Sequence, residues 1–260
     1  MSSELIINSS RDKSRIGLLK DKKLVEFHQE SDETKFNVGD IYVGKVKKIN
    51  KSLNAAFIDI GFEKDAFLHY LDLGPQFLSL KSFVKNVRGK GKVSYDSSKK
   101  LDDINKFGKI NEVLTKGDEI LIQVVKEPIS TKGPRVTTEL SLAGRYLILV
   151  SFSETINVSK KITKREERMR LINLIKSIRP KNFGVIVRTV AENKSVSELD
   201  KDLQSLTSIW KEGVKKIKKA KVGEKIIGEE NKATSLLRDI LNSSFDNLSL
   251  IHISEPTRPY

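Results

Sequence analysis

The segment from Asp40 to His69 limits the possible folds of this chain more than any other, because it alternates with the two-residue period of β-strands. Within it, the run from Ala55 to Ile60 places three small or aliphatic residues on one face, which we predict to be the core face: Ala56, Ile58 and Ile60. Phe57 therefore falls on the opposite face, together with Asp59.

The strand that follows, from Asp65 to His69, places a second phenylalanine outside. Ala66 and Leu68 form its inner face by the same alternation, so Phe67 points outward. Lysines surround the two rings in the sequence: Lys45, Lys47, Lys48, Lys51 and Lys64. Exposed aromatic pairs on a basic sheet are typical of proteins that stack on single-stranded RNA, where each base stack contributes roughly 1–3 kcal/mol. The alternative, that other elements cover both rings as ordinary core, stays open from the sequence.

The charge balance and the rare residue types restrict the partners. Lys and Arg number 48 against 34 Asp and Glu, a net charge of +14 that favours polyanionic partners. The chain has no cysteine and only 3 histidines without metal-ligand spacing, so we expect no disulfide, no zinc site and no oligomer formed through zinc. Apolar runs are too short for a membrane span and the first residues do not resemble a secretion signal. We therefore expect a cytoplasmic protein with no membrane partner.

Short strands are expected through the first half of the chain and beyond it. Five are predicted outside the opening segment: Glu4–Asn8, Ser14–Leu19, Lys23–His28, Glu119–Val125 and Pro134–Leu140. The polar turn at 20–22 predicts a hairpin between the second and third of these. Gly44 and Gly61 lie where a small barrel needs bends or bulges.

Residues 86–111 interrupt the strand pattern. This segment has seven basic residues against three acidic ones and almost no periodicity. We expect a long mobile loop that adds to a basic surface, and a solvated insertion without a role is an equal alternative.

A first helix is predicted from an apolar stripe that ends before Pro180. The stripe consists of Leu171, Leu174, Ile175 and Ile178. Thr163 and Glu166 have the spacing of a capping box at its start. A strand over 184–187 follows and ends at Arg188.

A second helix is predicted after Ser195 and Glu198, which form another capping box. Its apolar residues recur every three or four positions as far as Trp210, which we expect in the core rather than in a binding site. The lysine-rich run 211–225 is predicted to be a solvated helix face.

Four motifs, in this order, resemble the N-terminal half of the RNase E/G endoribonucleases: IYVGKV, AAFIDIG, TTELSLAGRYLIL and GVIVRT. The resemblance runs from about residue 4 to about residue 250. It implies an α+β fold in which a five-stranded OB-type β-barrel and a mixed α/β 5′-sensor region are inserted into a split RNase-H-like subdomain. The implied boundaries are 1–37 for the first part of that subdomain, 38–140 for the barrel with its basic loop, 141–232 for the sensor, and 233–250 for the returning part. The last residues, 251–260, do not resemble the expected continuation.

The resemblance also implies site residues. Three would bind RNA, namely Phe57, Phe67 and Lys132, and four would line a pocket for the 5′-phosphate: Gly144, Ile148, Arg188 and Thr189. A guanidinium that forks onto two phosphate oxygens beside a hydroxyl donor suits that role. From the dipeptide alone, a polar strand end is the favoured explanation of Arg188-Thr189, and the phosphate role comes from the resemblance.

Catalysis is not expected from the residues of this chain. The family hydrolyses single-stranded RNA with magnesium held by aspartates of a later domain, and motifs like those are not found here. We therefore assign no catalytic residue and no metal ligand, and expect a truncated endoribonuclease of RNA and rRNA processing, with Mg2+ required only by the full-length protein. The alternative is a non-enzymatic OB-fold RNA-binding or ribosome-associated protein.

Overall fold

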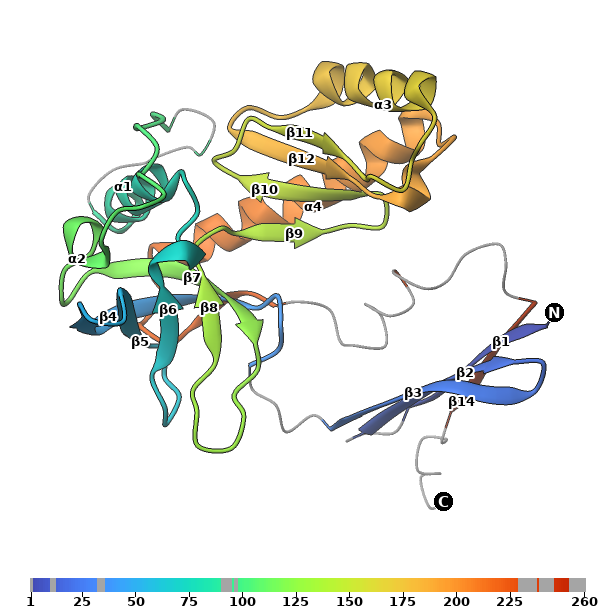
Figure 1. Ribbon diagram of the computed structural model, residues 1–260, viewed down its shortest axis with the longest axis horizontal. Coiled ribbons are helices and arrows are strands. Elements are labelled where there is room, and N and C mark those ends of the chain that lie inside the picture. Colours follow the sequence, from blue (N-terminus) through green and yellow to red (C-terminus); the bar gives the residue numbers. More distant parts are fainter. Residues whose placement is uncertain are drawn as a thin grey trace, which may run out of the picture. The chain divides into compact units, whose positions relative to one another are not determined.

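Strand pairing divides the chain between two units in the computed structural model, which describes residues 2–9, 13–31, 36–89, 95, 98–228, 238 and 246–252. The smaller unit combines residues 1–35 with 229–260, and the larger unit spans 36–228. Figure 1 shows the elements of each unit.

The smaller unit is a four-stranded sheet with the order β14-β1-β2-β3. Its strands are β1 (Ser3–Ser9), β2 (Lys13–Lys20), β3 (Lys23–Ser31) and β14 (Asn247–His252). The predicted hairpin is confirmed: Asp21 and Lys22 connect β2 to β3 at positive φ angles of 48° and 63°, as a two-residue turn of type I′ requires.

Both ends of the chain meet in this sheet, because β1 pairs in parallel with β14, Glu4 lying opposite Asn247. Of the predicted return over 233–250, the structure describes residue 238 and residues 246–250, and of the predicted tail only Ile251 and His252, within β14. The rest of both segments lies outside the described residues. That this sheet is part of an RNase-H-like subdomain stays a prediction.

Five strands of the larger unit close into a barrel, which confirms the α+β class. They are β4 (Ile41–Asn50), β5 (Ala55–Asp59), β6 (Ala66–His69), β7 (Glu119–Lys126) and β8 (Arg135–Thr137). The order is β4-β5-β6-β8-β7, and pairing of β4 with β7 closes the ring. The strand predicted to run to Leu140 ends instead at Thr137, and a separate strand begins at Ser141.

The predicted inner face of the barrel is confirmed. Ala56, Ile58 and Leu68 are fully buried, and so are the inward residues of β4 and β7. Gly61 bends the chain at a φ of 74°, as expected. Gly44 does not form a bulge; a Cβ there would lie 2.5 Å from Cγ2 of Ile58, so glycine allows a close approach inside the barrel.

The expectation of a loose loop over 86–111 is wrong at several points. Residues 86–88 are the last turn of a helix that the sequence analysis missed, α1 (Phe77–Arg88), and Ile110 begins α2 (Ile110–Val113). Tyr95 is buried, and its hydroxyl accepts a hydrogen bond from the backbone N–H of Phe152 at 2.7 Å. Tyr95 is therefore part of the core and not of a solvated loop.

A second sheet of the larger unit carries the two long helices. Its strands, in the order β11-β12-β10-β9, are β9 (Ser141–Ala143), β10 (Leu147–Ser151), β11 (Ile156–Val158) and β12 (Phe183–Val187). The inward residues of β10 and β12 share one core with α3 (Arg165–Ile178) and α4 (Val196–Ile217) (Figure 1). A further strand, β13 (Lys225–Ile227), lies within the residue range predicted for the sensor but pairs with β4 of the barrel.

The two helix starts differ from each other. At α4, Ser195 and Glu198 form the predicted capping box, and Trp210 is buried in the core as expected. At α3, Lys164 occupies the N-cap instead of Thr163, without a side-chain cap. Glu166 is then one position too early to complete a capping box.

The lysine-rich run after Trp210 is solvated, as predicted, and α4 ends within it at Ile217. Among the residues that the structure describes, none of the helices is both long and apolar enough to span a bilayer.

Candidate nucleic-acid interface

Two phenylalanines stand side by side on the outer face of the barrel. Phe57 of β5 and Phe67 of β6 are direct cross-strand partners, and their ring centroids lie 5.9 Å apart at an interplanar angle of 69°. Both rings are partly exposed, whereas Ile58 and Leu68 beside them are fully buried. The edge-to-face contact lets each ring support the other while part of each surface stays open.

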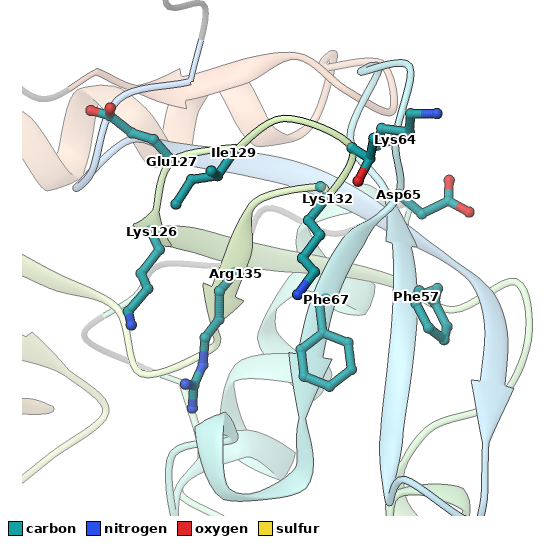
Figure 2. Close-up of a pocket in the computed structure, with 11 residues that line it drawn as sticks. Phe57, Lys64, Asp65, Phe67, Lys126, Glu127, Ile129, Lys132 and Arg135 are labelled. Atoms are coloured by element: carbon teal, nitrogen blue, oxygen red, sulfur yellow. The ribbon is translucent and has the colours of Figure 1, made fainter.

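A groove of about 720 Å³ lies beside the rings. Figure 2 shows the residues that line it, which come from β5, β6, β7 and β8 and from the loops that connect β5 to β6 and β7 to β8. Four of them are cationic: Lys64, Lys126, Lys132 and Arg135. The two acidic lining residues are Asp65 and Glu127, and Asp65 is already paired with Lys47 at 2.9 Å.

The loop between β7 and β8 holds Lys132 over this groove. Backbone hydrogen bonds in both directions between Ile129 and Lys132 close a tight turn, with Ser130 at a positive φ of 50°. Gly133 then passes so close to the carbonyl oxygen of Asp65 that any Cβ would collide with it. Lys132 extends toward Phe67 (Figure 2), and its ammonium group has no hydrogen-bond or ion-pair partner among the described residues.

This face of the barrel carries several lysine side chains. The hydrogen bond to Asp65 and the charge of that carboxylate raise the pKa of Lys47. Lys45, Lys48 and Lys64 are exposed. The face therefore combines two apolar rings with several charges that suit phosphates.

The four residues assigned to a phosphate pocket belong to the second sheet and to the segments that follow its strands, and the structure brings two of them into contact. Arg188 follows β12, and its Nη1 donates a hydrogen bond to the carbonyl oxygen of Gly144 at 2.8 Å. The Thr189 hydroxyl pairs with the hydroxyl of Ser159 at 2.9 Å. Ile148 lies on the inner strand β10, opposite Ile186 of β12 and Ala143 of β9.

A carboxylate from α4 shapes the turn after Gly144. Asp202 accepts hydrogen bonds from the backbone N–H groups of residues 145, 146 and 147 at 3.2, 2.8 and 2.9 Å. A Cβ at Gly144 would lie 2.6 Å from this carboxylate, so a larger residue would displace it. Arg145 and Lys194 lie 5.7 and 5.5 Å from the ring centre of Tyr146, which adds two cations to this corner.

Sequence reasoning missed three residues that shape these surfaces, namely Arg135, Asp72 and Asp202. Alternation along β8 could have placed Arg135 on the outer face, because Val136 beside it is buried. Its ion pair with Asp72 depends on the pairing of distant segments and leaves no local signal.

Metal ligands are a separate question. The described part of the chain contains no group of three or more His, Cys, Asp or Glu side chains that could hold a metal ion. The described residues therefore offer no set of ligands for the magnesium ion that the resemblance assigns to the full-length protein, and no role of these residues depends on a metal.

Comparison with known proteins gives consistent matches. The model of the Ribonuclease E/G family matches residues 141–255. Ribonuclease G of Haemophilus influenzae is 32% identical over 247 residues, which cover 95% of this chain and 47% of that protein. Ribonuclease G of Escherichia coli K12 is 30% identical over 248 residues with the same shares, and ribonuclease E of Synechocystis sp. is 37% identical over 174 residues, 66% of this chain and 22% of that protein.

The chain thus spans about half the length of the ribonuclease G relatives that it matches. None of these relatives favours the alternative of a non-enzymatic RNA-binding protein. The four motifs, the closed barrel with its paired phenylalanines and these matches together identify the chain as a member of the Ribonuclease E/G family.

Proposed function

We propose that this chain supplies the RNA-binding and 5′-monophosphate-sensing part of a metal-dependent endoribonuclease that acts on single-stranded RNA in RNA processing and decay. The observation that carries the proposal is the pair of partly exposed rings, Phe57 and Phe67, beside a groove with four cations. Bases within a duplex already stack on one another, so exposed rings select unpaired nucleotides.

In this proposal each part of the face has its own task. Phe57 and Phe67 stack on bases, and Lys132, which extends toward Phe67, neutralises a phosphate. Stacking does not distinguish one base from another, so we expect binding with little sequence preference.

The second part of the proposal assigns the binding of the 5′-phosphate to Gly144, Ile148, Arg188 and Thr189 of the second sheet and the segments after its strands. Support comes from the contact of Arg188 with Gly144 and from the Thr189 hydroxyl that follows it in the chain. A guanidinium and a hydroxyl on adjacent residues can bind one phosphate through charge-assisted hydrogen bonds.

Substitutions at neighbouring positions of one strand test the RNA-binding proposal. Phe57→Ala and Phe67→Ala should each weaken the binding of a fluorescent single-stranded RNA roughly 5- to 150-fold, the loss of one base stack, with little change in thermal stability. Ile58→Ala, whose side chain is fully buried, should lower the free energy of unfolding by about 2–5 kcal/mol.

The two measurements separate the faces of β5. Fluorescence anisotropy gives the RNA affinity, and thermal melting gives the stability of the same preparations. If Phe57→Ala unfolds the protein as severely as Ile58→Ala and leaves the affinity of the folded fraction unchanged, the rings are core and the proposal is wrong.

A further inference from the structure

Five side chains form one continuous row across the outside of the barrel. Strand pairing places them next to one another in this order: Lys48, Phe57, Phe67, Arg135 and Lys126. Each belongs to a different strand, and paired strands lie about 4.8 Å apart. The row therefore crosses all five strands, with a lysine at each end and three flat side chains between them.

Two β-bulges bring the lysines into this row. The pairing of β4 with β5 shifts between Val46 and Lys48, and the pairing of β7 with β8 shifts between Val124 and Lys126. Bulges re-aim side chains and occur often beside functional sites. Both lysines are exposed, and neither has a hydrogen-bond or ion-pair partner within the described ranges.

The guanidinium of Arg135 is held in a fixed orientation by Asp72. Its Nε and Nη2 donate to the two carboxylate oxygens of Asp72, both at 2.9 Å. The backbone of Asp72 is fixed in turn, because its carbonyl oxygen accepts from the Thr137 hydroxyl at 2.6 Å and from the Thr138 N–H at 3.1 Å. The Arg135 side chain is nevertheless 45% exposed.

This pairing limits what the arginine can contact. The Nε–Nη2 edge of the guanidinium, one of the two edges that can fork onto a phosphate, is taken by Asp72, whose negative charge also repels phosphates. The flat faces of the guanidinium are not used by that ion pair, and guanidinium planes stack on nucleic-acid bases. Figure 2 shows Arg135 between Lys126 and Phe67, with Phe57 beyond Phe67.

We propose that Arg135 is a third base-stacking platform, next to Phe67 and Phe57, on a single-stranded RNA track that crosses the barrel from Lys48 to Lys126. Asp72 acts as the positioning residue that holds this platform, and the two lysines bind the phosphates at the ends of the track. This inference rests on the proposed RNA-binding function and extends it from two stacked bases to three.

Two probes separate stacking from charge. Decauridine RNA carries bases and phosphates, whereas inorganic polyphosphate carries the charge alone. The double variant Arg135→Ala/Asp72→Ala leaves the formal net charge of the chain unchanged, and Arg135→Lys keeps a positive charge without a flat face. We expect each to weaken decauridine binding roughly 5- to 150-fold and to leave polyphosphate binding within about twofold. Lys48→Ala should weaken the binding of both decauridine and polyphosphate.

The outcomes distinguish this inference from the proposal on which it rests. Equal losses for both probes would make Arg135 a phosphate contact, and unchanged decauridine binding would remove it from the track; either result overturns the inference while Phe57→Ala still weakens RNA binding. A wild-type chain that does not bind decauridine overturns the proposed function itself. Thermal melts show whether each variant is folded. If the double variant is unfolded, the comparison of decauridine with polyphosphate is made with Arg135→Lys, which can retain an ion pair with Asp72.

Discussion

Phenylalanine occupies opposite environments in this chain, and its position in a strand or helix decides which. Phe77 and Phe83 point inward from α1 and are almost completely buried, whereas Phe57 and Phe67 occupy outward positions of β5 and β6. The cross-strand contact of the two rings stabilises the sheet, but their partial exposure to water leaves apolar surface that folding alone does not use. At the scale of single residues, this is the feature of the barrel that a binding function explains and a core function does not.

Arg188 allows a test of the proposed phosphate site at the same scale. Arg188→Ala should abolish any preference for RNA with a 5′-monophosphate over RNA with a 5′-hydroxyl, because in the proposed site the guanidinium contacts the RNA only at its terminal phosphate. Overall RNA affinity should change by less than about twofold, since the barrel supplies the stacking. Competition binding with the two forms of one oligonucleotide measures this.

A matched control removes the same charge elsewhere. Arg165 is exposed at the start of α3, and Arg165→Ala should leave the preference intact. A wild-type chain with no preference for the monophosphate, or an Arg165→Ala variant that loses it as completely, would contradict the assignment of Arg188.

At the scale of elements, local patterns were predictable and long-range pairings were not. Alternation identified the inner and outer faces of β5 and β6, and the capping box identified the start of α4, because these signals lie within a few residues. The parallel contact of Phe67 with Arg135 joins segments far apart in sequence, and no local period reports it. The same holds for Tyr95, whose surrounding segment is polar although its ring is buried.

The helix α1 was missed for a different reason. Its buried side chains do recur at helical spacing, as Phe77, Leu80, Phe83, Val84 and Val87. Most of the helix lies before the segment 86–111 that was predicted to be a loop, in a stretch for which no element was predicted, and its last turn lies inside that segment. The pattern was present in the sequence, and a systematic test of the helical period would have found it.

The capping box of α4 gives a pH prediction at this scale. Hydrogen bonds from the backbone and hydroxyl of Ser195, together with Lys194, lower the pKa of Glu198 from 4.5 to about 2. A carboxylate with a lower pKa in the folded state stabilises the fold above its unfolded pKa, and this contribution is lost as the pH falls from about 4.5 toward 2. Glu198→Gln should therefore reduce the loss of stability across that range.

Denaturant unfolding at pH values from 7 to 3 measures this difference. Glu212→Gln is the control, because Glu212 lies on the same helix and has no hydrogen-bond or ion-pair partner among the residues described. The capping box is not the source of the pH dependence if wild type and Glu198→Gln lose the same free energy of unfolding as the pH falls. The same conclusion follows if Glu212→Gln reduces that loss as much as Glu198→Gln does.

At the scale of the whole molecule, a net charge of +14 could attract RNA without any defined track. Lysines are spread over several surfaces, including the solvated end of α4 around Lys211. The barrel face differs from those surfaces because its cations adjoin aromatic rings and a groove. Diffuse attraction predicts that any surface lysine contributes equally to the salt dependence of RNA binding, whereas a local site predicts that only the lysines of the barrel face do.

Salt titration of RNA binding separates the two. We expect the affinity to fall steeply with salt, because each neutralised phosphate of a single strand contributes about 0.7 to the slope of log affinity against log salt. Lys132→Ala should reduce the magnitude of that slope by about 0.7, because Lys132 extends toward Phe67 beside the groove (Figure 2). Phe57→Ala should lower the affinity at every salt concentration and leave the slope unchanged, because stacking releases no counterion.

Lys211→Ala is the control, because it removes the same charge from α4, and it should change neither the affinity nor the slope. If Lys211→Ala reduces the slope as much as Lys132→Ala does, the whole charge of the molecule attracts the RNA and the barrel face is not its specific site.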